Sequence, residues 1–189
     1  MDGKATYLGE KYQQERTFTT PYAHVNYRYS FSRSKNFWMN YTYETDGFTA
    51  DQWLPVVDLS NPQQSFVGNP DLELPQKHDA YLTFRNFDFG TRSGYFMWLG
   101  GTHTNNRIVN YTIYDESQRA ETTYRNIDGV YSIMGGLSYS WNKKFGEAHK
   151  WRFGTGLRMN YNHNEGFING ELYQADTRSF TPTVEFSYD

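Results

Sequence analysis

The sequence predicts an all-β fold, an antiparallel up-and-down meander of about seven or eight strands. Nearly every segment that reads as ordered alternates apolar and polar residues with a period of two, and none shows the 3.6-residue period of a helix. Short and long connections alternate along the chain. In addition, 19% of the residues are aromatic although only 37% are hydrophobic, which is too many rings for a disordered chain.

The first hairpin is predicted between residues 23 and 43. Odd positions from Ala23 to Phe31 are apolar or aromatic, whereas the even positions between them are polar. The same alternation returns from Phe37 to Tyr43. Because the link Ser32–Lys35 is short and polar, the two segments are expected to pair as antiparallel neighbours.

The strand pattern is clearest at residues 131–141 and 151–161. Along the apolar face of each segment, aromatic residues stand at the ends and aliphatic residues in the middle. Rings prefer the membrane–water interface, and a strand of about 9–11 residues spans a bilayer. The meander is therefore expected to be part of an outer-membrane β-barrel. A wet barrel interior also accounts for the mean hydropathy of -0.85.

The remaining strands are less regular. They are expected at residues 80–84, 95–104 and 180–188, with one more within about residues 5–18. Pro182 lies on the apolar face of the last strand and removes one ladder hydrogen bond. It predicts a bulge or a strand start at that position.

The connections sort by length. The short ones lie near residues 32–36, 88–94 and 142–150, and the long ones near 45–77, 107–122 and 163–175. Outer-membrane barrels have short periplasmic turns and long extracellular loops. The alternation therefore predicts that the long connections share the extracellular end.

Two stretches of the chain resemble a known family. Residues 53–62 followed by Gly68-Asn69-Pro70-Asp71-Leu72 resemble the "P-x-x-D-x-x-N-P" stretch and "G-N-P-x-L-x-P" turn of TonB-dependent receptor barrels of the Bacteroidetes type. The last proline, Pro75, comes one residue late. The segment Thr123–Gly129 resembles the same family's "T-x-Y-x-N-x-x-G" lead-in to a strand. The residues of the signature turn are Gly68, Asn69, Pro70 and Leu72.

The resemblance implies a barrel-wall segment of a TonB-dependent transporter for an unidentified ligand, in the outer membrane of a Gram-negative bacterium. Residues 1–189 then form a single partial barrel domain with no plug domain and no signal peptide, since Met1–Lys4 lacks an apolar core. The implied partners are outer-membrane lipid and, in the full-length protein, the plug domain and TonB. Such a fragment is expected to self-associate through exposed strand edges.

Candidate ligand-binding residues lie in the long connection 45–77. Asp46, Asp51 and Asp58 are candidates to bind a cation or an incoming ligand, although such residues also simply solvate loops. Trp53 is a candidate to stack on a sugar ring, or else a girdle or loop-packing residue.

Other features argue against metal, cofactor or catalytic chemistry. His103 and His163 lack the paired spacing of a metal site and are expected to face a wet lumen. The chain has no cysteine and no Gly-x-Ser-x-Gly elbow, so neither a cofactor nor an enzyme activity is expected. A net charge of -3 without a basic stripe argues against a nucleic-acid partner.

Two other functions stay open. One is a complete small barrel that serves as an anchor, adhesin or enzyme. The other is a soluble, aromatic-rich carbohydrate-binding β-domain, which needs a dry core between two sheets. Arginines on the polar strand faces argue against a dry core. They are Arg28, Arg85, Arg152 and Arg158, and in a closed barrel they are expected to pair with carboxylates such as Glu44 and Glu185.

Overall fold

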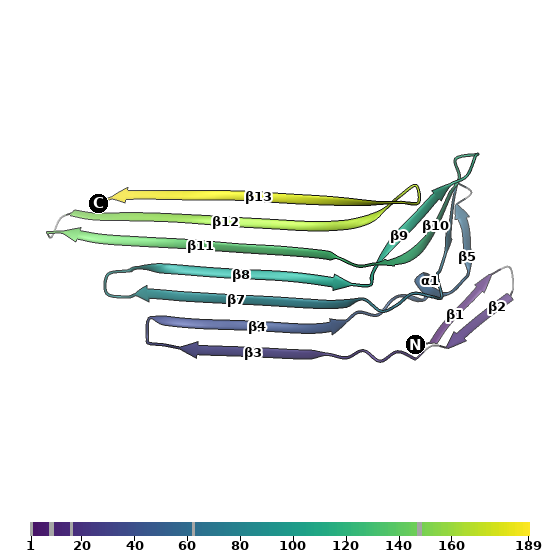
Figure 1. Ribbon diagram of the computed structural model, residues 1–189, viewed down its shortest axis with the longest axis horizontal. Coiled ribbons are helices and arrows are strands. Elements are labelled where there is room, and N and C mark those ends of the chain that lie inside the picture. Colours follow the sequence, from purple (N-terminus) through teal and green to yellow (C-terminus); the bar gives the residue numbers. More distant parts are fainter. Residues whose placement is uncertain (1, 8–9, 16, 62, 147–148) are drawn as a thin grey trace.

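The structure is a computed structural model, and it describes residues 2–7, 10–15, 17–61, 63–146 and 149–189. Its main body is a seven-stranded antiparallel sheet in the order β13-β12-β11-β8-β7-β4-β3 (Figure 1). The strands are β3 (Ala23–Ser30), β4 (Lys35–Thr45), β7 (Gln76–Asp88), β8 (Ser93–Asn105), β11 (Val130–Phe145), β12 (His149–Ile168) and β13 (Glu171–Tyr188). The predicted all-β antiparallel meander is confirmed.

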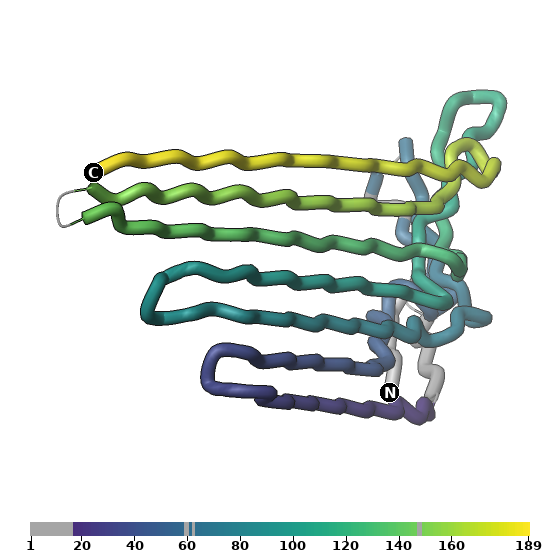
Figure 2. The backbone as a smooth tube through the Cα atoms, turned by 60° about the vertical axis from the view of Figure 1, so that its left-hand side comes forward, coloured from purple at the N-terminus to yellow at the C-terminus, as the bar shows by residue number. Residues whose placement is uncertain are grey.

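Short connections join β3 to β4, β7 to β8 and β11 to β12 at one end of the sheet, where the C-terminus also lies (Figure 1). We call this the turn end. At the opposite end, the loop end, the chain leaves the sheet between β4 and β7 and again between β8 and β11 (Figure 2). The predicted sorting of short and long connections by end is confirmed for these segments.

The two excursions pair with each other and form a second sheet in the order β5-β6-β10-β9. Its strands are β5 (Val57–Asn61), β6 (Gln64–Val67), β9 (Arg107–Tyr114) and β10 (Ala120–Ile127). β6 and β10 run parallel, with residues 120–122 opposite residues 64–66. The long connections are therefore folded. We call this unit the loop sheet.

A short helix, α1 (Ala50–Trp53), precedes the loop sheet. No helix was predicted, because four residues make a single turn and cannot show a helical period. The side chain of Gln52 closes its first turn by accepting a hydrogen bond from the backbone N–H of Thr49 at 3.0 Å. Such capping satisfies a backbone group that an isolated turn would leave open.

The long connection predicted at residues 163–175 is wrong. β12 continues to Ile168 and β13 begins at Glu171, so only Asn169 and Gly170 link them. Both residues have positive φ, 51° and 78°. Such a pair is typical of the type I′ hairpin turn, and Asn-Gly is its preferred sequence. The dipeptide was the signal that should have predicted the hairpin.

The expected bulge at Pro182 is also wrong. β13 pairs with β12 in unbroken register, and Pro182 lies opposite Leu157. β13 is an edge strand of the sheet, where a residue without an N–H costs no ladder bond on the open side.

The N-terminal segment forms two strands where one was predicted within about residues 5–18. β1 (Asp2–Tyr7) and β2 (Glu10–Glu15) pair as a separate antiparallel hairpin. Residues 8, 9 and 16 of the predicted segment lie outside the described residues.

The buried hydrophobic side chains of the described residues all lie at the loop end. They are Phe48, Trp53, Leu54, Leu72, Ile127 and Val130. Among the described residues, no helix is long and apolar enough to cross a membrane.

Candidate functional site

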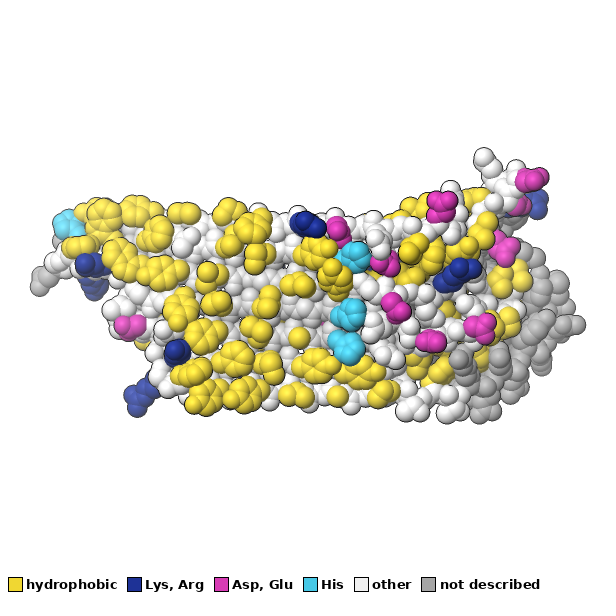
Figure 3. Space-filling model, viewed as in Figure 1, with side chains coloured by type: hydrophobic (Ala, Val, Ile, Leu, Met, Phe, Trp, Pro, Cys, Tyr) yellow, Lys and Arg dark blue, Asp and Glu magenta, His cyan; other side chains and the backbone are white. Residues whose placement is uncertain are grey.

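One face of the large sheet carries exposed apolar side chains in cross-strand rows. The row near the middle of the sheet contains Met39, Leu82, Leu99, Gly135, Met159 and Phe180. Leu99 is 44% exposed and Phe180 is 68% exposed. An exposed apolar surface of this extent is unfavourable in water and favourable against hydrocarbon. Figure 3 shows this outward face.

Aromatic side chains border the apolar band at the turn end. Trp151 packs edge-on against Phe186 and Tyr188, with ring centroids 5.3 and 5.2 Å apart. Trp141 lies opposite Phe153 in the next row. These rings stand where an aromatic belt meets the lipid headgroups.

A row of polar side chains, most of them aromatic or imidazole rings, borders the band at the loop end. In cross-strand register it contains Tyr43, His78, His103, Tyr131, His163 and Asp176. The prediction that His103 and His163 face the lumen is wrong, because they share the face of Tyr131, whose ring stacks on His163 at 5.1 Å. Figure 3 shows a group of histidines near the middle of this face, with most of the carboxylates in view lying beyond them toward the loop end.

His163 sits in a hydrogen-bond network beyond the apolar band. Its Nδ1 lies 2.7 Å from Asp176, and its Nε2 lies 3.2 Å from Glu165. The bond to Asp176, then that to Glu165, raises the pKa of His163. The bond from His163, then that from Tyr161, lowers the pKa of Asp176. Residues 151–161 suffice to span a bilayer, so both groups lie outside the spanning segments.

The opposite face of the large sheet is polar, with rings among its charged groups. The guanidinium of Arg158 lies 5.6 Å from the ring centroid of Trp98. Gly136 leaves room for that ring, since a Cβ there would lie 2.3 Å from Trp98 Nε1.

The large sheet is open, with β3 and β13 at its edges, and among its described residues the polar-face arginines do not form the ion pairs with Glu44 and Glu185 that were predicted for a closed barrel. Glu44 pairs with Lys77 at 2.9 Å, and Arg152 pairs with Asp189. Among the described residues, no ion pair joins Glu185 to an arginine.

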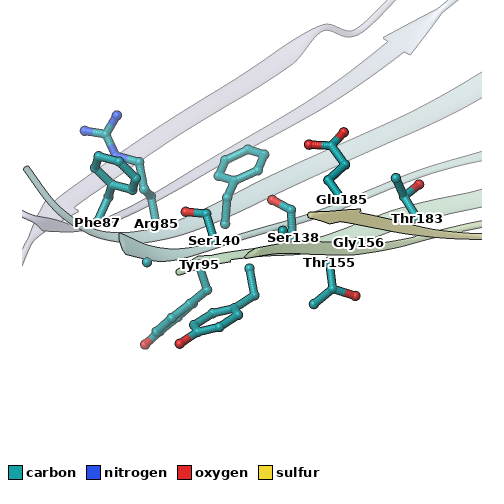
Figure 4. A pocket seen from close by; sticks show the side chains of 13 residues that line it. Arg85, Phe87, Tyr95, Ser138, Ser140, Thr155, Gly156, Thr183 and Glu185 are labelled. Atoms are coloured by element: carbon teal, nitrogen blue, oxygen red, sulfur yellow. The ribbon is translucent and has the colours of Figure 1, made fainter. Parts of the chain in front are cut away.

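A cleft of about 470 Å³ lies over this sheet near its turn end. Gly154 and Gly156 contribute no side chains to its floor, whereas Arg85 and Glu185 stand at its two sides. Figure 4 shows Arg85, Ser138, Ser140, Thr183 and Glu185 on one face of the strands, and Tyr95 and Thr155 on the other. The polar face thus offers a concave surface with one charge of each sign.

The signature turn at residues 68–72 joins α1 to the loop sheet. A Cβ on Gly68 would lie 2.1 Å from the carbonyl oxygen of Leu54, so only glycine fits. The backbone N–H of Asn69 donates to the carbonyl of Gln52 at 2.7 Å. The Asn69 side-chain amide donates to the carbonyl of Tyr124 at 2.8 Å. Leu72 is fully buried in the cluster around Trp53.

The second family stretch completes this joint. The side chain of Asn126 donates to the carbonyl of Glu73 and accepts from its N–H, both at 2.8 Å, as a neighbouring strand would. The threonine that fits the family spacing before Tyr124 and Asn126 is Thr122. It is buried and lies 2.9 Å from the hydroxyl of Thr112. Burial, and secondarily the charge of Asp51, raises the pKa of Tyr124.

The comparison with known families agrees with this geometry. A family model described as the outer membrane protein beta-barrel family matches residues 1–189. The chain belongs to the outer membrane protein beta-barrel family. No curated protein matches it, and no solved structure does. Membership places the barrel in the outer membrane of a Gram-negative bacterium, with the apolar band against lipid.

In this barrel-family chain the candidate ligand residues do not converge. Asp46 follows β4, Asp51 lies in α1 and Asp58 lies in β5, and all three are exposed. Among the described residues no group of three His, Cys, Asp or Glu side chains is arranged to hold a metal ion. Trp53 is 0% exposed, so its ring is closed to a sugar, and the packing alternative describes its position.

A groove on the loop sheet was not predicted from the sequence. It has a volume of about 530 Å³ and is lined in part by Ser65, Tyr111, Glu121 and Thr123. Arg125 caps the Tyr111 ring at 3.7 Å from its centroid. The alternation of residues 107–114 and 120–127 was the available signal, but residues 107–122 were read as a loop.

Proposed function

We propose that this chain is a barrel-wall segment of a TonB-dependent outer-membrane transporter. The observation that carries the proposal is the joint made by the signature turn and Asn126. Gly68, Asn69 and Leu72, which the family resemblance singles out, bind α1 and β10 into one unit. A small barrel that serves only as an anchor has no need of so elaborate a loop end.

In this proposal the loop end captures the ligand. The groove beside Tyr111 and Thr123 is open and carries hydroxyls, an aromatic ring and charges of both signs, which suits a polar ligand. Its charged residues are Asp115, Arg119 and Glu121. Trp53 contributes indirectly, because it packs in the buried cluster that holds α1 in place.

The polar face of the sheet would contact the plug domain of the full-length protein. The cleft between Arg85 and Glu185 offers charges of both signs and a floor of small residues. TonB would act on that plug and not on this chain directly. No catalysis enters the proposal.

Uptake in living cells tests the proposal. Cells with and without the gene are offered a panel of ferric siderophores, oligosaccharides and peptides, each with TonB present or deleted. We expect uptake of at least one compound to need both the gene and TonB. Unchanged uptake of the whole panel, with altered adhesion or envelope attachment, would favour a small anchoring barrel.

Two matched variants then test the loop-end groove. Thr123→Trp fills the groove and should reduce uptake of the active compound. Val184→Trp, on the outward face of β13 and outside the groove, should leave uptake unchanged. Equal uptake by both variants at equal surface amounts would remove the groove from the proposal.

A further inference from the structure

Two arginines of the polar face line one groove near the turn end of the large sheet. Arg28 of β3 and Arg85 of β7 lie on either side of β4, and the groove has a volume of about 280 Å³. In the ladder Arg28 is opposite Trp38 and Arg85 is opposite Asn36. Both partners alternate along β4 with Met39, which belongs to the apolar outward row. The groove therefore opens on the polar face and not toward lipid.

The described residues leave both guanidinium groups of this groove without a counter-ion. The strands β3, β4, β7 and β8 carry three carboxylates, those of Glu44, Asp79 and Asp88. Glu44 and Asp79 both bind Lys77 near the loop end, each at 2.9 Å. Asp88 accepts backbone N–H groups within its own turn. No carboxylate of these strands is left to pair with the two arginines.

Two other arginines of the polar face differ in this respect. Arg152 forms an ion pair with Asp189, and the guanidinium of Arg158 lies over the ring of Trp98. The two arginines of the groove have neither kind of partner among the described residues, and like charges that share a groove repel each other. An anion bound between them would remove this repulsion.

The neutral polar groups of the groove also fit an anion. The side-chain oxygen of Asn36 accepts the hydroxyl of Ser30 at 2.8 Å, so the amide N–H groups of Asn36 are available as donors. Thr83 adds a hydroxyl, and no described carboxylate lines the groove. The lining is therefore rich in hydrogen-bond donors and carries positive charge only.

Apolar surface adjoins these charges. The ring of Phe96 is 38% exposed although it stands on the polar face, opposite Arg85 and Ser138 in the two ladders. Trp38 supplies a second ring to the groove. The apolar part of a ligand gains free energy by covering such rings. A guanidinium binds a carboxylate through two parallel hydrogen bonds. The groove thus offers contacts both for a carboxylate and for the apolar body that carries it.

We propose that this groove binds a small organic acid. Its carboxylate lies between Arg28 and Arg85, and its apolar body covers Phe96 beside Trp38. The ligand thereby relieves the repulsion between the two arginines and covers the exposed ring. The site is separate from the ligand groove of the loop sheet. Binding there does not rest on transport, because it needs only that solutes reach the polar face.

Binding of fluorinated probes to the full chain in detergent micelles tests the proposal. The probes are para-fluorobenzoate, the uncharged para-fluorobenzyl alcohol and the ring-free fluoroacetate, each titrated with its acid ionised and followed by fluorine NMR. We expect saturable binding of para-fluorobenzoate and weaker binding of the other two. Equal affinity for the alcohol would overturn recognition of the carboxylate. Equal affinity for fluoroacetate would overturn the role of the rings and favour an acidic protein side chain as the occupant.

The double variant Arg28→Gln/Arg85→Gln tests the two charges. It should weaken binding of para-fluorobenzoate about tenfold, since each exposed charge pair contributes about three-fold. The control Lys143→Gln/Arg178→Gln removes the same charge from exposed positions on the outward face of the sheet and should bind as the unaltered protein does. Unchanged binding by the test variant, or equal weakening in both variants, overturns the proposal.

Two further variants separate loss of the site from misfolding. Arg28→Lys/Arg85→Lys keeps both charges, so affinity as low as that of the glutamine variant would overturn their role. Phe96→Ala should weaken binding of para-fluorobenzoate roughly five-fold and leave that of fluoroacetate unchanged. Its control is Phe180→Ala, which removes the same ring from the outward face. Equal effects of the two alanine substitutions would contradict the contact with Phe96.

Discussion

The membrane wall and the loop end hold together in different ways. In the wall, long strands such as β11 and β12 are joined by an unbroken backbone ladder, while side chains such as Leu137 and Phe153 point into the surroundings. At the loop end, short strands and α1 surround a small core centred on Trp53 and Leu72. The wall therefore depends on lipid as its apolar partner, whereas the loop end buries its own.

This difference explains where the family motifs lie. A ladder needs mainly alternation, so many sequences satisfy it. The loop end must close two excursions from different strand pairs on each other. Gly68 and Asn126 make contacts that few other residues would reproduce. The motif residues therefore lie where few residue types can satisfy the local backbone and hydrogen-bond geometry.

Removal of the Trp53 ring should have the largest effect. Trp53→Ala leaves a cavity in the loop-end core, and a buried aromatic residue replaced by alanine costs about 3–5 kcal/mol. Limited proteolysis of the protein in vesicles should show faster cleavage within residues 46–75, with the wall still protected. Trp151→Ala is the matched control, because this ring is 39% exposed in the wall and should leave loop cleavage unchanged. Equal loop cleavage in both variants would contradict the separation of the two regions.

A charge on the outward face of the wall should have the next largest effect. Leu137→Arg places a cation in the apolar band, which costs about 2–4 kcal/mol at the membrane midplane. Its neighbour Ser138 faces the polar cleft, so Ser138→Arg should cost far less. Equilibrium unfolding of both variants in vesicles measures the difference. If the two substitutions destabilise the protein equally, the assignment of faces fails.

A methyl group at the signature turn should have a smaller effect. Gly68→Ala forces backbone atoms of Leu54 away, and overpacking of this kind typically costs about 1–3 kcal/mol. Gly154→Ala is the control in the wall, where the new Cβ would lie an ordinary 3.5 Å from Glu185. Thermal unfolding of the loop end should shift for Gly68→Ala alone. An unshifted loop end would mean that the turn has room to relax.

The wall was largely predictable from the sequence, because its alternation is local. Residues 131–141 and 151–161 were assigned to antiparallel strands, and the structure pairs them in continuous register. The face that each residue occupies follows from its parity in the strand. The lumen assignment of His163 failed because polarity was weighed above parity at a position beyond the apolar band.

The loop end was hidden from the sequence because its contacts are long-range. The parallel pairing of residues 64–66 with 120–122 spans many intervening residues, and no local pattern encodes it. The burial of Trp53 depends on Leu72, which a turn brings back to it. The β12–β13 hairpin was the exception, since Asn169-Gly170 is a local signal that was overlooked.

The smallest predicted effect lies at the boundary between wall and loop end. Hydrogen bonds to Asp176 and Glu165 raise the pKa of His163 above its ordinary value of 6.5. Its contribution to stability is then fully present below pH 6.5 and is lost as the pH rises through the raised pKa. Asp176→Asn removes the main partner and should lower the midpoint of the His163 titration, followed by NMR of the imidazole. The melting temperature should fall more at pH 6 than at pH 8.

The control for this titration is Asp115→Asn, in the turn between β9 and β10, which should leave the His163 midpoint in place. The comparison of the two variants is informative because Asp176 belongs to β13 and His163 to β12. The hydrogen bond between these residues therefore ties the edge strand to its neighbour just beyond the lipid. A midpoint that does not move in Asp176→Asn would assign the shift to Glu165. The hydrogen bond between β12 and β13 would then contribute little to the titration of His163, since Glu165 lies on the same strand as His163.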